Sequence, residues 1–143
     1  MILKRFIRMT CLLLTISMLC ATPAYAQEQD SRASRYIATY RAYCSRTSAT
    51  TLVVSFMVTG MDAMDEIGAN MIKVQYSSDQ VNWTTARTFT KDVYTRFVDY
   101  NTGAHAAEVT CVIPAGKYYR AYVEFYAAKD NGFAERYMYT DII

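Results

Sequence analysis

The chain has 143 residues, of which 52% are hydrophobic and 14% aromatic, and its formal net charge is +2. Three of its 15 basic residues but none of its 13 acidic residues lie in the first 26 positions, so the rest of the chain carries 12 basic against 13 acidic residues. This near-neutral remainder has no basic patch of the kind that binds nucleic acid or anionic lipid. Its 117 residues are the size of one domain.

Residues 1–26 have the pattern of a cleavable secretory signal peptide. A basic start precedes the apolar stretch of residues 11–20, and a small-residue site ending at Ala26 follows. Signal peptidase recognises this order, whereas a membrane-spanning helix needs about 20 apolar residues. We therefore predict cleavage after Ala26, secretion, no membrane insertion of the cleaved protein, and a flexible lead-in over residues 27–34. The alternative is an uncleaved N-terminal anchor.

The remaining residues, 35–143, are predicted to form a single domain of short strands. Runs rich in Tyr, Val, Thr, Phe and Ile alternate polar and apolar residues, and Gly, Asp, Asn and Ser separate the runs. A period of two indicates strands. The predicted strands are residues 36–44, 50–59, 71–77, 83–90, 94–100, 108–113, 118–127 and 134–141. Their spacing favours an all-β, two-sheet antiparallel sandwich, immunoglobulin-like or fibronectin-III-like in outline, with a small β-barrel as the alternative.

Cys44 and Cys111 are the cysteines that remain after cleavage at Ala26. An even number of cysteines in an exported domain permits a disulfide, and a sandwich would bring the two strand ends to the same pole. We therefore predict a Cys44–Cys111 bridge. The alternative is two unpaired buried thiols, because each cysteine also occupies an inward position in its strand.

Residues 60–70 are predicted to form an acidic loop between two core strands. Asp62, Asp65 and Glu66 are candidate binding residues in this loop, because carboxylates bind hard cations and polar ligands. Their spacing matches no calcium loop, so we predict no metal site. In the structural interpretation Asp62 caps a helical turn and the other carboxylates bond its free N–H groups. Three apolar side chains would then cover the end of the sandwich: Met61, Met64 and Ile67.

The sequence offers no catalytic set. His105 is the only histidine and is predicted to lie in a loop without a catalytic partner. The common nucleophile, zinc and phosphate-loop motifs do not occur. We therefore predict a protein that is not an enzyme and takes no cofactor.

Tyrosine is frequent, with 13 residues in the chain. Tyr118, Tyr122 and Tyr126 alternate with apolar residues in one predicted strand and should point outward. Exposed rings can stack on sugars or anchor a protein partner, although tyrosine pairs also stabilise ordinary sheets. These three tyrosines are our candidate binding residues for an extracellular glycan or protein.

Two segments carry resemblances. Residues 76–83 resemble the Tyr-Ser-x-Asp-Gly-x-x-Trp hairpin of secreted bacterial β-sandwich modules, with Gln80 where that pattern often has Gly. The V-T-G-M-D-A-M-D-E-I-G-A sequence of residues 58–69, with G-K-Y-Y at 116–119 and F-Y-A-A-K-D at 125–130, resembles a family of small secreted bacterial proteins that form a domain of unknown function. The resemblance implies export and a sandwich fold but no activity.

These observations favour a secreted module that binds a glycan or protein without catalysis. The alternative is a structural or self-associating extracellular module that pairs through the predicted edge strand, residues 134–143. A small secreted hydrolase is the third hypothesis, which the missing catalytic set disfavours.

Overall fold

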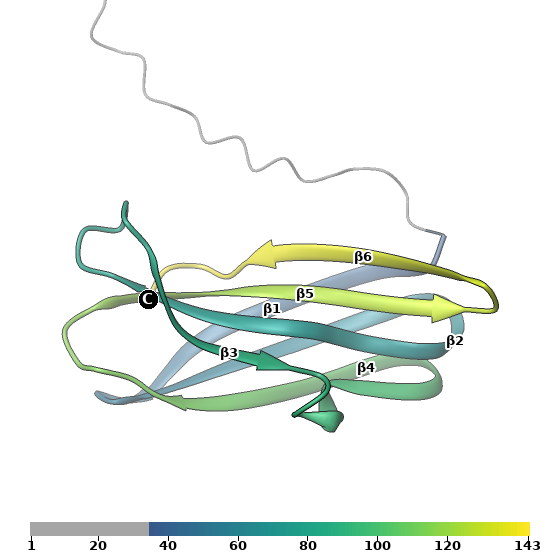
Figure 1. Ribbon diagram of the computed structural model, residues 1–143, viewed down its shortest axis with the longest axis horizontal. Helices are drawn as coiled ribbons and strands as arrows, with labels where there is room; N and C mark the ends of the chain where they lie inside the picture. The colour runs from purple at the N-terminus through teal and green to yellow at the C-terminus, as the bar shows by residue number, and fades with distance from the viewer. Residues whose placement is uncertain (1–34) are drawn as a thin grey trace, which may run out of the picture. The chain divides into compact units, whose positions relative to one another are not determined.

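The computed structural model describes residues 35–143, which form strands joined by short turns (Figure 1). The predicted signal peptide (residues 1–26) and lead-in (residues 27–34) lie outside the described residues. The elements are β1 Ile37–Ser48, β2 Thr51–Ser77, β3 Thr84–Thr90, the 3-10 turn η1 Thr95–Phe97, β4 Val98–Val112, β5 Tyr118–Lys129 and β6 Gly132–Tyr139. The strand pairings are antiparallel, so the all-β fold class is confirmed. In this part of the chain no helix is long and apolar enough to cross a membrane.

The strand β2, 27 residues long, organises the sheet. Its first half, residues 51–59, lies between β1 and β4, and its last part, residues 71–76, lies between β3 and β5. The strand β6 then pairs with the far edge of β5. A strand that changes its neighbours midway has to bend, so the sheet curls into an antiparallel half-barrel (Figure 1).

Residues 60–70, predicted as a loop, belong to β2. The pairing of β2 with β4 shifts register before Met64, and the extra β2 residues form a bulge that bends the strand without ending it. The predicted helical turn capped by Asp62 is therefore wrong, because the backbone stays extended. Met64 and Ile67 are buried as predicted, whereas Met61 is exposed on the bulge.

The strand predicted over residues 94–100 and the loop predicted around His105 also differ from the structure. Residues 95–97 form η1, which places the Phe97 ring in the core, and the 15-residue β4 then runs through His105 without interruption. Pairing with β2 keeps this polar stretch extended. Such long-range pairing outweighs the weak local strand preference of these residues.

The core lies inside the curl, and the inward apolar residues of β2 and β5 fill much of it. Phe56 makes edge-on contacts with Phe97 at 5.8 Å and with Phe125 at 6.2 Å between ring centroids, which joins β2, η1 and β5. Tyr119 is fully buried, and its hydroxyl donates a hydrogen bond of 2.7 Å to the backbone oxygen of Pro114. The buried ring therefore leaves no unsatisfied hydroxyl.

Cys44 and Cys111 are free thiols, so the predicted disulfide is not formed. Cys44 pairs with Val54 of β2 and Cys111 with Leu52 of β2, so β2 separates the two cysteines. Two strand spacings amount to roughly 9–10 Å, whereas a disulfide requires Cα atoms about 4.4–6.8 Å apart. The alternative of two unpaired buried thiols is correct for Cys111, whereas Cys44 is unpaired but only half-buried.

We expect the Cys44 thiol to react slowly. Burial raises its pKa from 9.0 to about 11, which lowers the reactive thiolate fraction near neutral pH about a hundredfold. In a Cys111→Ala variant, a chromogenic disulfide reagent should label Cys44 at least tenfold more slowly in native protein than in denaturant. Equal rates, or an intact mass of the parent domain that is two hydrogens short, would contradict this account.

Candidate functional site

The outer face of β5 carries the tyrosines that the sequence singled out. The register of β6 against β5 sets Tyr139 opposite Tyr122 and Glu135 opposite Tyr126, so outward residues of both strands share one surface. Trp83, at the end of the turn before β3, joins the same surface because the Arg120 guanidinium of β5 lies over its ring. We call this surface the aromatic face, and it consists of Trp83, Tyr122, Tyr126, Phe133, Tyr137 and Tyr139.

Rings of the aromatic face stack across the two strands. Tyr122 lies 5.7 Å from Tyr137 at an interplanar angle of 29° and 5.3 Å from Tyr139 at 59°. Tyr126 lies 6.0 Å from Phe133 at 28°. These contacts cover part of the β5 rings, whereas Phe133 and Tyr137 on β6 stay 63% and 56% exposed. The free ring surface therefore lies along β6.

Cationic side chains lie between the rings. The Arg120 guanidinium is 4.2 Å from the Trp83 ring centre and 4.3 Å from that of Tyr139, and its Nε donates to Gln75 Oε1 at 2.9 Å. The Lys91 ammonium lies 4.3 Å from the Tyr126 ring centre. Such cation–π contacts hold the rings in place, so the face is an ordered surface.

The hairpin of residues 78–82 positions Trp83. Asp79 Oδ1 accepts hydrogen bonds from the backbone N–H of Val81 at 2.9 Å and of Asn82 at 2.8 Å. These bonds hold the pKa of Asp79 well below its usual range. The Trp83 indole N–H donates to the backbone oxygen of Gln80 at 3.2 Å, which fixes the ring beside Arg120.

Gln80 is strained in this turn, because its φ is +62°, a conformation that costs a non-glycine residue about 1–2 kcal/mol. Gln80→Gly should raise the free energy of unfolding by about 0.5–1 kcal/mol, since part of the gain is lost to the more flexible unfolded chain. Urea denaturation measures the change. The reverse control is Gly116→Ala, at a φ of +74° with open space around it, which should destabilise. A Gln80→Gly domain no more stable than the parent would refute the argument.

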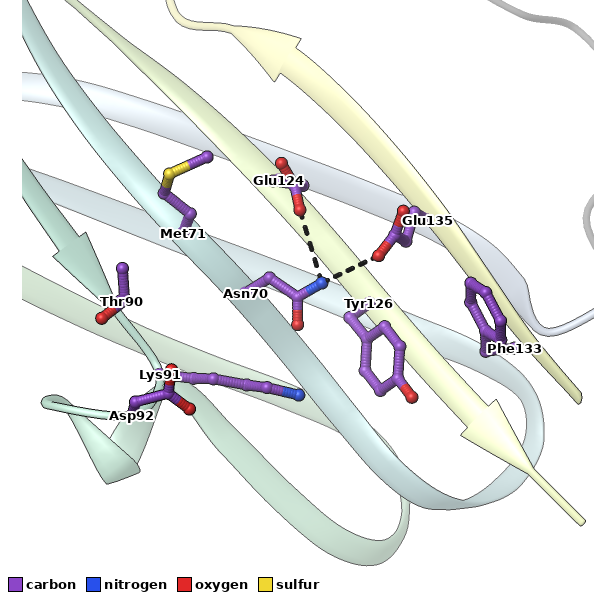
Figure 2. Close-up of a pocket in the computed structure, with 9 residues that line it drawn as sticks. All are labelled: Asn70, Met71, Thr90, Lys91, Asp92, Glu124, Tyr126, Phe133 and Glu135. Carbon is purple, nitrogen blue, oxygen red and sulfur yellow. Dashed lines mark hydrogen bonds between the residues drawn. The ribbon is translucent and has the colours of Figure 1, made fainter. Parts of the chain in front are cut away.

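A shallow pocket of about 460 Å³ opens at one end of the aromatic face (Figure 2). Asn70 of β2 lies at its centre, and its Nδ2 donates to Glu135 Oε1 at 3.1 Å and more weakly to Glu124 Oε1 at 3.4 Å. The Oδ1 atom of Asn70 is buried and accepts no hydrogen bond. Tyr126 and Phe133 belong both to the pocket lining and to the aromatic face.

The acidic candidates do not join this pocket, because each is engaged elsewhere. Asp62 Oδ2 accepts from Lys129 Nζ at 2.6 Å, and this hydrogen bond lowers the pKa of Asp62. Asp65 Oδ2 accepts the backbone N–H of Asp130 at 2.7 Å. Both bonds fasten the β2 bulge to the end of the β5–β6 hairpin. Within residues 35–143, no group of three or more metal-ligating side chains could hold a metal ion.

Glu66 and Tyr118 lie near the aromatic face but are not part of its ring contacts. Glu66 Oε1 accepts a hydrogen bond of 2.8 Å from Lys91 Nζ, which also lies over Tyr126. Tyr118 lies at the start of β5 on the outward side and is 42% exposed. Of the predicted binding residues, the structure therefore places Tyr122 and Tyr126 on one face, where each takes part in its own ring stack.

His105 lies on β4, away from the aromatic face. Its Nε2 is 2.8 Å from the backbone oxygen of Arg96, and its Nδ1 is 3.8 Å from Asp99 Oδ2. Its ring lies 5.9 Å from that of Phe56. The imidazole therefore helps to hold η1 against β4 and has the contacts of a structural side chain.

Sequence reasoning missed the β6 half of the site. A two-residue turn at Asp130 and Asn131 sets the register of β5 against β6, with Lys129 opposite Gly132. Counting back from that turn would have placed the outward rings of β6 beside those of β5. Asn70 lay at the end of the acidic loop predicted over residues 60–70, and nothing in that loop indicated that its side chain would meet β5 and β6.

Comparison with known proteins found no matching protein-family model, curated protein or solved structure. The function therefore has to be argued from the aromatic face and its pocket.

Proposed function

We propose that this protein is a secreted, non-catalytic module that binds an extracellular glycan with its aromatic face. The observation that carries the proposal is the cluster of stacked rings on β5 and β6, with Phe133 and Tyr137 more than half exposed. These rings contribute nothing to the core, yet neighbouring side chains order them. Exposed, ordered rings offer sugars the flat apolar surface on which their C–H faces stack.

Polar groups between the rings favour a glycan over a purely apolar partner. Arg120, Lys73 and Gln75 supply donors and acceptors next to Trp83 and Tyr122. Sugar hydroxyl groups require both kinds of partner, whereas the centre of a protein interface is usually depleted of charge. The alternation of rings with charged and amide side chains therefore matches the mixed surface of an oligosaccharide.

We also infer that the curled sheet acts as an open, immunoglobulin-like sandwich. No ladder joins β1 to β6 within residues 35–143, which supports an open arrangement over a closed barrel. The signal peptide pattern of residues 1–26 supports an extracellular encounter with the glycan.

A glycan array followed by calorimetry on residues 27–143 tests the proposal. The double variant Phe133→Ala/Tyr137→Ala should weaken binding of any captured glycan at least tenfold. Tyr43→Ala is the matched control, since Tyr43 is 57% exposed on β1 and is not one of the rings of the aromatic face. Equal affinities of the double variant and the parent would remove the aromatic face from the function.

Self-association is the second candidate function. The strand β6 pairs with β5 alone in the described part of the chain, and it carries the most exposed rings of the aromatic face. Such an edge offers unpaired backbone groups to a second copy. Light scattering coupled to size exclusion measures the molar mass in solution and should show dimers or larger assemblies. A strict monomer at high concentration would contradict this candidate function.

A further inference from the structure

Two cationic side chains lie side by side at one end of the aromatic face. Lys73 of β2 is paired with Tyr122 of β5, and Gln75 of β2 is paired with Arg120 of β5. Lys73 and Arg120 are therefore diagonal neighbours on the outer side of the sheet, roughly 7–8 Å apart at their Cα atoms. Like charges this close repel each other, and an anion between them would relieve the repulsion.

Neither of these cations has a carboxylate partner within residues 35–143. The ion pairs there join other cations, such as Lys91 with Glu66 and Lys129 with Asp62. The Lys73 ammonium instead lies 5.7 Å from the ring centre of Tyr122. The positive charge at this end of the aromatic face is therefore left without a counter-ion in the described part of the chain.

The Arg120 guanidinium is held in a fixed position with unused donors. Trp83 and Tyr139 lie against it, with ring centres at 4.2 and 4.3 Å, and its Nε donates to Gln75 Oε1 at 2.9 Å. Its two Nη atoms have no acceptor among the described residues. Burial lowers the pKa of Arg120, which shows that this half-buried cation has lost part of its hydration. Rings on two sides restrict an acceptor to the guanidinium edge between them.

A carboxylate has the shape that such an edge accepts. Its two oxygen atoms can receive two parallel N–H bonds from one guanidinium, an arrangement that a lysine alone cannot offer. The Lys73 ammonium, one position away across the sheet, supplies further donors to the same group. Within a glycan, a carboxylate belongs to an acidic sugar.

The opposite end of the aromatic face disfavours anions. Glu124 is four residues along β5 from Arg120, about 13 Å in a strand, and Glu135 of β6 lies further toward the hairpin turn. Asn70 donates to both carboxylates but, as a neutral amide, leaves their charge in place (Figure 2). A chain that is acidic throughout would bring its carboxylates against these two. The face therefore fits a glycan that is acidic at one end only.

We infer that Lys73 and Arg120 bind the carboxylate of an acidic sugar at one end of the glycan, whose neutral sugars extend along β6 over Tyr137 and Phe133. This inference rests on the proposed function and specifies the class of glycan. The cations attract the acidic sugar, and the carboxylates of the opposite end reject a chain that carries a charge on every sugar.

Calorimetry with three glucose oligosaccharides of equal length tests the inference. One ends in a single glucuronic acid at its non-reducing end, one carries the amide of that acid, and one consists of glucuronic acid throughout. The parent domain should bind the singly acidic chain at least tenfold more tightly than either of the others, and raised salt should reduce its preference over the amide. Trp83 is the only tryptophan of the chain, so its fluorescence should change when the singly acidic chain binds.

Charge-removing variants locate the preference. Arg120→Gln should bind the singly acidic chain and its amide with similar affinity. Lys73→Gln should reduce the preference at least threefold, and it decides the question if Arg120→Gln does not fold. Arg41→Gln, which removes an exposed arginine of β1 outside the aromatic face, should retain the preference. Melting curves establish that each variant is folded.

The outcomes separate this inference from the proposed function. Equal binding of the singly acidic chain and its amide, equally tight binding of the fully acidic chain, an unchanged Trp83 signal, or a preference that survives in the folded variants overturns the inference. If another glycan binds and depends on Phe133 and Tyr137 while none of the three probes does, the inference fails and the proposed function stands. If no glycan binds the folded domain, both fail.

Discussion

Gly68→Ala is expected to destabilise the domain by about 3 kcal/mol or more, at the upper end of overpacking costs. Gly68 lies in the middle of β2, where it pairs with both β4 and β5. A Cβ atom there would lie 2.0 Å from the backbone oxygen of Phe97 and 2.7 Å from Val98 Cα. Backbone on a second strand cannot move aside as a side chain can. Gly68 is therefore required because the backbone of Phe97 and Val98 approaches β2 too closely for a Cβ atom.

Thermal unfolding measures this effect, and the expected loss corresponds to a melting temperature at least about 12 °C lower for a domain of this size. Gly103→Ala is the matched control in β4, because its Cβ would meet its nearest neighbour, the backbone oxygen of Asp62, at an ordinary 3.5 Å. The control should change stability by less than about 1 kcal/mol. If the two variants melted at the same temperature, the close approach of η1 to β2 would be incorrect.

Phe125→Ala should cost about 3–5 kcal/mol of unfolding free energy, the range for deleting a buried phenylalanine ring. The Phe125 ring is fully buried and contacts Tyr40 at 5.0 Å and Phe56 at 6.2 Å. It therefore joins β5 to β1 and to the first half of β2, and no neighbour could fill the resulting cavity without moving a strand.

Phe133→Ala is the control for that substitution, since it removes the same ring from the exposed edge of the hairpin. We expect a change below about 1 kcal/mol, because Phe133 buries little surface and its ring stacks on the exposed side of Tyr126. Chemical denaturation compares the two variants. Equal losses would mean that the aromatic face, and not the interior of the curl, holds the domain together.

Local alternation predicted the inside and the outside of the main strands. Leu52, Val54 and Phe56 point inward, as do Tyr119 and Phe125, because a strand alternates its faces whatever its partners are. The same reasoning placed Tyr122 and Tyr126 on the outside. These parts of the fold depend on the side-chain period alone.

Long-range pairing determined what the sequence could not predict. The segment around Asp62 is polar and contains two glycines, which locally favours a loop, yet β4 and β5 pair on either side of it and extend it into a strand. Cys44 and Cys111 were expected to meet because both lie near strand ends. The insertion of β2 between them is a property of the topology, which no local pattern records.

The candidate site was half predictable for a related reason. The rings of β5 follow from alternation within one strand. Their partners on β6 follow only from the register of the hairpin, and the Arg120 contact with Trp83 depends on the turn before β3. Asn70 enters the pocket because a register shift of β2 against β5 falls beside it. A bulge of this kind directs one side chain out of the alternation.

Two-dimensional NMR of the isotopically labelled domain, titrated with a glycan that it captures, tests the central claim most directly. The proposal predicts that the amide signals of β5, β6 and the second half of β2 shift, together with the indole signal of Trp83. Signals of β1 and of the first half of β2 should not change. Perturbations confined to β1 and β4, with the indole signal unmoved, would contradict the assignment of function to the aromatic face.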